Sequence, residues 1–134
     1  MRILRKKIIF FTIMIFVFVG LICLVIYLKN VRDYKQAVRE INIDEIDISD
    51  ISDGVYTGEC NVNFIYAKVE VTIQNGEIAN INILEHKNER GKGAESITDK
   101  IIKEQKIDVD AISGATNSSI VIKKAVENAL KGEV

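Results

Sequence analysis

The hydrophobic positions near the start of the chain form one continuous run. Ile8 to Leu28 is a stretch of 21 residues without a charge, rich in isoleucine, phenylalanine, valine and leucine. About 20 apolar residues suffice for a helix to cross the hydrocarbon core of a bilayer. The run therefore predicts a transmembrane helix over residues 8–28, preceded by a short cytoplasmic N-terminus over residues 1–7.

Two other kinds of N-terminal segment also contain apolar runs. A cleaved signal peptide has an apolar region of about 7–15 residues that ends in a small-x-small site, and no such site follows Leu28. A lipoprotein signal needs a small residue directly before its acylated cysteine, whereas Cys23 follows a leucine and an isoleucine. An uncleaved anchor therefore fits the sequence better than either alternative.

Residues 29–52 form a stalk or linker between the apolar run and the rest of the chain. The charged part, residues 29–40, either continues the helix or forms a stalk. Residues 41–52 mix isoleucine with acidic and polar residues in an irregular register. This pattern fits an extended segment that packs its isoleucines on the domain as well as it fits a solvated linker. We expect the domain proper over residues 53–134.

Within this domain, alternation of apolar and polar positions predicts a meander of antiparallel strands. A short β-rich segment, residues 55–57, precedes residues 64–73, which alternate as a half-buried strand does. Asn75-Gly76 is a strong hairpin signal because both residues tolerate positive φ. Residues 77–84 then return as the partner strand.

The hydrophobic pattern changes to helical spacing in the last third of the chain. Residues 85–93 are expected to be a charged, glycine-containing loop. Residues 94–106 and the stretch from Ile120 to Leu130 place apolar side chains at helical intervals, and Gly132 ends the second helix. The expected fold class is therefore α+β, with one N-terminal transmembrane helix followed by a small domain with an antiparallel strand meander and two helices.

Charge narrows the location and the partners of the domain. Basic residues are densest before the apolar run, which favours a cytoplasmic N-terminus and an extracytoplasmic domain in the cell membrane. Residues 44–134 hold ten basic and seventeen acidic side chains, for a net charge of −7. An acidic surface disfavours nucleic acid as a partner. The chain has no Cys-x-x-Cys pair or other metal-ligand cluster, so we expect neither iron–sulfur nor structural zinc.

The stretch Asp110-Ala111-Ile112-Ser113-Gly114-Ala115-Thr116 carries the strongest chemical signal. It places two hydroxyls around a Gly-Ala turn directly before the last helix, where backbone N–H groups and the positive end of the helix dipole favour a phosphate. The same residue types are also common as simple helix caps. From the residues alone, both interpretations stay open.

From Asp53 onward the chain resembles the small FMN-binding domain. That domain also occurs in flavin-carrying subunits of sodium-pumping quinone reductases and of membrane ferredoxin-oxidising complexes, and in small anchored proteins linked to extracytoplasmic electron transfer. The resemblance covers roughly 80 residues and rests on four segments: Asp53-Gly54-Val55-Tyr56-Thr57-Gly58, Asn75-Gly76-Glu77-Ile78, Asp110 to Thr116, and Ala125-Val126-Glu127-Asn128-Ala129-Leu130.

The resemblance implies a cofactor and a set of site residues. In the family, Asp-x-x-Ser-Gly-Ala-Thr is recognised by a flavin transferase, which takes FMN from FAD and esterifies its phosphate to the final hydroxyl. Thr116 would be the acceptor, and the helix beginning near Asn117 would offer N–H groups to the phosphodiester. The family also places a glycine-containing loop near the flavin ring, where the ring contacts would come from His86, Asn88 or Glu89. The remaining residues of the recognition site would be Asp110, Ser113, Gly114 and Ala115.

The expected function is that of a membrane-anchored extracytoplasmic flavoprotein with FMN esterified to Thr116. It would relay electrons between membrane redox carriers, a quinone or a quinone-linked dehydrogenase, and an external acceptor, after maturation by the flavin transferase. This makes it more a carrier than an enzyme with its own substrate pocket. Two alternatives remain: a noncovalent FMN-binding sensor or storage module, and a non-redox accessory scaffold of a membrane complex.

Overall fold

The computed structural model describes residues 1–87 and 92–132, and the chain divides into two compact units, Met1–Asp33 and Tyr34–Val134. Helix α1 (Arg2–Glu40) makes up the first unit and continues into the second. Its apolar side chains between Ile8 and Leu28 are exposed, and in the part of the chain that the structure describes it alone is long and apolar enough to cross a membrane. An anchor and a signal peptide share these properties. The helix also continues over residues 29–40, as one of the two interpretations of that segment has it.

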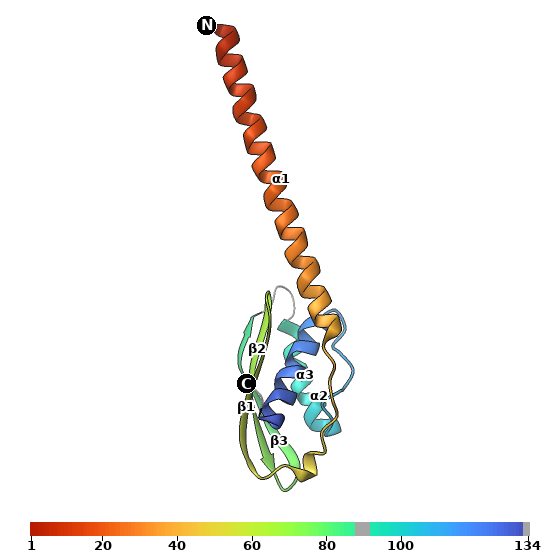
Figure 1. Ribbon diagram of the computed structural model, residues 1–134. Coiled ribbons are helices and arrows are strands. Elements are labelled where there is room, and N and C mark those ends of the chain that lie inside the picture. Colours follow the sequence, from red (N-terminus) through yellow and green to blue (C-terminus); the bar gives the residue numbers. More distant parts are fainter. Residues whose placement is uncertain (88–91, 133–134) are drawn as a thin grey trace. The chain divides into compact units, whose positions relative to one another are not determined.

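The second unit is built on a three-stranded antiparallel sheet of order β1-β2-β3 (Figure 1). Its strands are β1 (Gly54–Val62), β2 (Ile65–Gln74) and β3 (Glu77–Lys87). Asn75 and Gly76 join β2 to β3 with φ of 55° and 74°, as a tight hairpin of the primed type requires. The predicted α+β fold with its strand meander is confirmed, and the last strand is longer than expected. Residues 85–87 belong to β3 and not to a loop, because they stay paired with β2.

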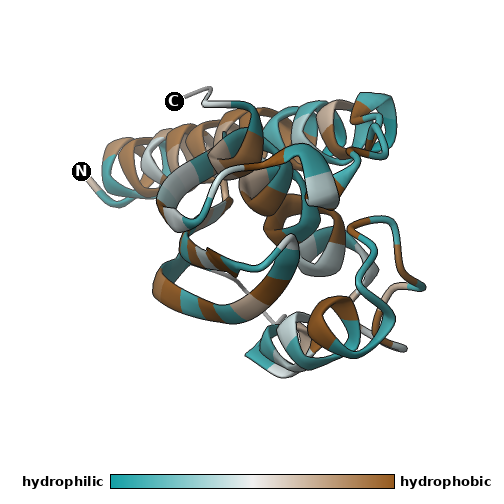
Figure 2. Ribbon diagram, turned by 90° about the horizontal axis from the view of Figure 1, so that it is seen from below, coloured by the Kyte–Doolittle hydropathy of each residue, from teal (hydrophilic) through white to brown (hydrophobic). Residues whose placement is uncertain are grey.

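The core lies between one face of this sheet and two helices. Every second residue of β2 from Ile65 to Ile73 is buried, and the alternation along the strands is visible in the hydropathy colours of Figure 2. Helix α3 (Thr116–Lys131) packs on β1 and β2, and α2 (Ile97–Glu104) packs on β3. The short 3-10 helix η2 (Lys92–Ser96) precedes α2, so the helix predicted over residues 94–106 is shorter and begins with a tighter turn.

Glycine and alanine set how closely α3 approaches the sheet. A Cβ atom on Gly58 of β1 would lie 2.2 Å from the backbone nitrogen of Ala129 and 2.4 Å from the carbonyl oxygen of Ala125. Real Cβ atoms do not come this close to backbone atoms. The strand and helix can therefore touch here only because β1 has no side chain at this position.

Residues 41–52, here called the strap, run from the end of α1 to β1 across the helical side of the domain (Figure 1). Ile48 is buried in the short helix η1 (Ile48–Asp50), and the other isoleucines of the strap are half-buried. Lys124 donates to the carbonyl of Asn42 at 3.1 Å, and the Asp44 amide donates to Glu127 at 3.3 Å. The strap is therefore the packed segment of the two alternatives, not a solvated linker.

The last turns of α1 also belong to the second unit. Tyr34 and Val38 are buried there, and the Tyr34 ring meets the ring of Phe64 edge to face at 5.3 Å between centroids. Phe64 lies in the turn between β1 and β2, so this contact ties the end of the helix to the sheet. The domain boundaries expected at residues 28/29 and 52/53 stay a prediction.

Candidate functional site

The segment that connects α2 to α3 contains the predicted phosphate turn, and lysines from both helices hold its first half. Lys123 of α3 donates to the Val109 carbonyl at 2.9 Å and to the Asp108 carboxylate at 3.0 Å. Lys100 of α2 donates to the Asp110 carbonyl at 3.1 Å. Val109 is buried while Asp110 is exposed, so the backbone is fixed and the Asp110 side chain projects into solvent.

The second half of the segment is a tight turn over residues 112–115. The Ala115 amide donates to the Ile112 carbonyl at 2.9 Å, and Gly114 has φ of 78°. A turn with positive φ at its third residue favours glycine there. A Cβ atom at Gly114 would meet no atom within 4 Å, so glycine is needed for backbone conformation, and the space beside it is open.

Thr116 is the first residue of α3, one residue earlier than the sequence predicted. The N-cap is Ala115, which has no side-chain hydroxyl and makes no side-chain capping bond. The first helical hydrogen bond runs from the Ser119 amide to the Ala115 carbonyl at 3.0 Å, which leaves the amides of Thr116 and Asn117 without a helical acceptor. Neither the Ser113 nor the Thr116 hydroxyl is therefore used as a cap.

The structure brings most of the predicted site residues together because they are consecutive in the chain. Asp110, Ser113, Gly114 and Thr116 are exposed, Asn117 is half-buried and Ala115 is buried. Within residues 1–87 and 92–132, the Ser113 and Thr116 hydroxyls make no hydrogen bond. Two hydroxyls of the turn are thus open to a reagent from solvent.

His86 lies near the end of strand β3, paired with Ala67 of β2, and not in a solvated loop. Its side chain is only 2% exposed, and its Nδ1 lies 3.1 Å from the carboxylate of Glu95 in η2. Helix η2 contacts α3, and in Figure 1 the end of β3, η2 and the start of α3 lie at one end of the domain. Glu95 is a partner that the sequence did not suggest. The predicted ring contacts Asn88 and Glu89 fall outside the described residues.

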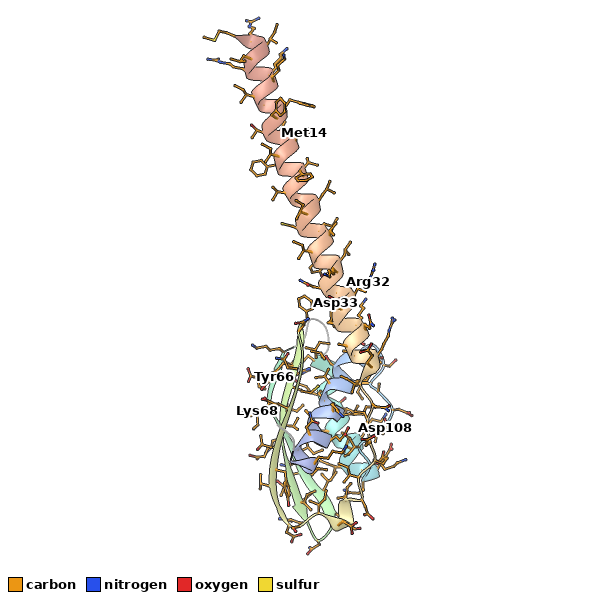
Figure 3. The ribbon with its side chains drawn as sticks, viewed as in Figure 1. Met14, Arg32, Asp33, Tyr66, Lys68 and Asp108 are labelled. Carbon is orange, nitrogen blue, oxygen red and sulfur yellow. The ribbon has the colours of Figure 1, made fainter. Side chains whose placement is uncertain are left out.

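Two side chains of the sheet have shifted pKa values. On the outer face of the sheet, the Tyr66 phenol donates to Glu59 at 2.6 Å, and this bond raises the pKa of Tyr66 to about 12. Burial raises the pKa of the Cys60 thiol on β1. Tyr66 and Lys68 point away from the helices (Figure 3). An open pocket of about 210 Å³ on this face is lined by Asn61, Asn63, Tyr66, Glu85 and Lys87.

Fold and turn together define a small α+β domain that presents a hydroxyl-bearing turn at the start of a helix, on a chain with a long apolar N-terminal helix. Residues 66–131 match the family model described as the FMN-binding domain. Over this range the chain belongs to that family. The match includes β2 from Tyr66 onward, β3, α2, α3 and the whole turn, and leaves β1 and the strap outside it. Among curated proteins none matches the chain.

FMN binding follows from the family, and the residues of the turn fit its phosphate. The space beside Gly114 is open, and the exposed residues Ser113 and Thr116 lie one and two positions from it in the chain. The amides of Thr116 and Asn117 lie at the positive end of a helix of 16 residues, where a phosphate group is stabilised. The segment contributes two carboxylates: Asp108, which pairs with Lys123, and Asp110, whose backbone carbonyl accepts a hydrogen bond from Lys100.

Proposed function

We propose that FMN is esterified to Thr116 and that the domain is an extracytoplasmic electron carrier held at the membrane by α1. The observation that carries the proposal is the state of Thr116. It is the exposed first residue of α3, its hydroxyl makes no bond within the described residues, and its own amide has no helical acceptor. A hydroxyl that is neither a cap nor a buried donor is available for chemistry.

The covalent step balances with FAD as the donor. The Thr116 oxygen attacks the phosphorus next to the riboflavin part of FAD, a new P–O bond forms, the pyrophosphate bond breaks and AMP leaves. The hydroxyl proton is lost to a base of the flavin transferase. The phosphodiester keeps one negative charge, which the amides of Thr116 and Asn117 are placed to stabilise.

A covalent bond suits the proposed location. Outside the membrane, a dissociated cofactor is diluted, whereas an esterified one stays at high effective concentration. Bound FMN would supply the redox chemistry, and the protein would supply position and tuning. The proposed partners are a membrane quinone or quinone-linked dehydrogenase on one side and an extracytoplasmic acceptor on the other.

Intact mass of the full chain, produced with and without a flavin transferase, tests the attachment. We expect a wild-type adduct equal to FMN minus water, formed only with the transferase and retained after denaturation. Thr116→Val keeps the shape of the side chain and removes its oxygen, so the adduct should vanish. Thr116→Ser is the matched control and should keep it.

The possible results separate the proposal from its alternatives. Unmodified wild type that releases flavin on denaturation would indicate a noncovalent FMN module. Wild type without flavin after transferase treatment would indicate a scaffold role. An adduct that persists in Thr116→Val would place the ester on another residue, with Ser113 as the neighbouring hydroxyl.

A further inference from the structure

Ser119, in the first turn of α3, links the helix to the turn that precedes it. Its side chain is fully buried. Its Oγ accepts a hydrogen bond from the Ile112 amide at 3.0 Å and donates one to the Ala115 carbonyl at 2.7 Å. One hydroxyl therefore holds both ends of the turn that presents Thr116.

We propose that Ser119 is a positioning residue for modification at Thr116. Its hydroxyl closes the 112–115 turn onto α3 and so keeps Ser113, Gly114 and Thr116 in one arrangement for the transferase. The inference rests on the proposed function, because it concerns the same turn, but it assigns a role to a residue that makes no contact with solvent.

The bond to Ala115 alone would not carry this inference. Serines inside helices often donate to the carbonyl four residues earlier, with little consequence beyond a slight bend. The bond from Ile112 is different because its donor lies seven residues before Ser119 and outside the helix. An oxygen with one proton and two lone pairs can serve both bonds at once.

The turn has few other restraints. The Ala115 amide closes it onto the Ile112 carbonyl, and the two lysines hold residues before it, at Val109 and Asp110. Within the described residues, the side chains of the turn itself make no hydrogen bond. Loss of the Ser119 hydroxyl would leave the Ile112 amide without its partner and free the turn to change conformation.

Ser118 provides a matched control in the neighbouring position. It is also buried, at 3% exposure, and its hydroxyl makes no hydrogen bond within the described residues. Replacing either serine by alanine removes one oxygen from the same turn of α3. Only Ser119→Ala should affect the presentation of Thr116.

The test measures transfer rates with the full chain, transferase and FAD over a series of protein concentrations. If the turn adopts the conformation that the transferase recognises for only a fraction of the time, the apparent affinity of the transferase for the protein is reduced in proportion to that fraction. We expect Ser119→Ala to raise KM for the protein roughly fivefold to tenfold, the effect of losing about one hydrogen bond. The kcat should stay unchanged, and Ser118→Ala should match wild type in both.

Hydrogen exchange provides a readout that does not depend on flavin. The Ile112 amide should exchange several times faster in Ser119→Ala than in Ser118→Ala, by a larger factor than the amides in the middle of α3. Equal KM values for the two variants, or equal exchange at Ile112, would overturn the inference while wild-type modification still supports the proposed function. Unmodified wild type would refute the proposed function and this inference with it.

Discussion

The two ends of α3 differ in the charge and the burial of their side chains. At its beginning, the helix has small neutral side chains, an exposed Thr116 and a buried Ser119, whose hydroxyl holds the preceding turn. At its end, the helix buries a carboxylate. Glu127 has no exposed surface and lies 3.1 Å from Lys124 and 2.7 Å from Lys131.

The difference follows from what each end contacts. The end of α3 lies under the strap, which removes Glu127 from water. A buried carboxylate is tolerated only when charges and donors surround it, and here two lysines and the Asp44 amide do so. The beginning of α3 faces solvent and has no such requirement, so its hydroxyl and amide groups stay available. One helix thus has a closed end that holds the strap and an open end whose hydroxyl and amide groups are accessible.

The largest expected effect concerns the close packing near the closed end. Gly58→Ala places a methyl group against the backbone of Ala125 and Ala129, which cannot move aside as a side chain could. Strand β1 and α3 must then separate. We expect a loss of about 3 kcal/mol in the free energy of unfolding, measured by urea denaturation of the detergent-solubilised chain. Gly20→Ala, in an uncrowded position of α1, is the control and should change little.

A second prediction concerns the carboxylate of the closed end. Glu127→Gln keeps the shape but removes the charge that two lysines contact, and we expect a loss of about 2 kcal/mol. The strap should open more often. Cleavage at Glu45 by a glutamate-specific protease should therefore become faster than in wild type.

The isoleucines of the strap provide the competing explanation for its attachment. Ile48→Ala tests it in the same protease assay, because it removes buried apolar surface and leaves the ion pairs intact. If Glu127→Gln has wild-type stability and protection while Ile48→Ala loses both, apolar packing and not the charge network holds the strap.

Local patterns predicted most of the fold. The apolar run, the alternation in β2 and the Asn75-Gly76 signal are each local patterns, and the structure confirms the long apolar helix, the strand and the hairpin that they predict. The environment of α3 could not be predicted in the same way. Lys123, Lys124 and Glu127 have the composition of a solvated face. Lys123 is instead buried against the segment before α3, and Lys124 and Glu127 contact a strap more than 70 residues away in the chain.

In the candidate site, too, the contiguous motif could be predicted from the sequence, whereas contacts between different elements could not. Asp110 to Thr116 could be identified because the motif is contiguous and its residues fit a turn before a helix. The sequence placed His86 in a loop because Glu85 and Lys87 are charged, but charged residues also suit the exposed face of an edge strand. The sequence does not indicate the bond between Ser119 and Ile112, because no local signal distinguishes Ser119 from Ser118.

Gly114, at the open end, and Gly58 require glycine for different reasons. Gly114 has open space but positive φ, so Gly114→Ala should cost about 1 kcal/mol through backbone strain and not through a clash. Gly114→Asn should cost less, since asparagine tolerates this conformation better. Urea denaturation of the two variants measures both effects. Equal losses for alanine and asparagine would show that the turn does not keep its positive φ in solution.

The smallest expected effect is a pH dependence at the closed end. The hydrogen bond from Lys131, at 2.9 Å, lowers the pKa of Asp44 below its ordinary value near 3.8. A lowered pKa contributes stability above the ordinary value, and this contribution is lost as the pH falls through the lowered one. The gap in unfolding free energy between wild type and Asp44→Asn should thus be constant near neutral pH and close below about pH 3.8. Asp50→Asn, an exposed strap residue whose carboxylate makes no ion pair in the described residues, should show no gap. A gap that persists unchanged into strong acid would mean that Asp44 acts through packing and not through its charge.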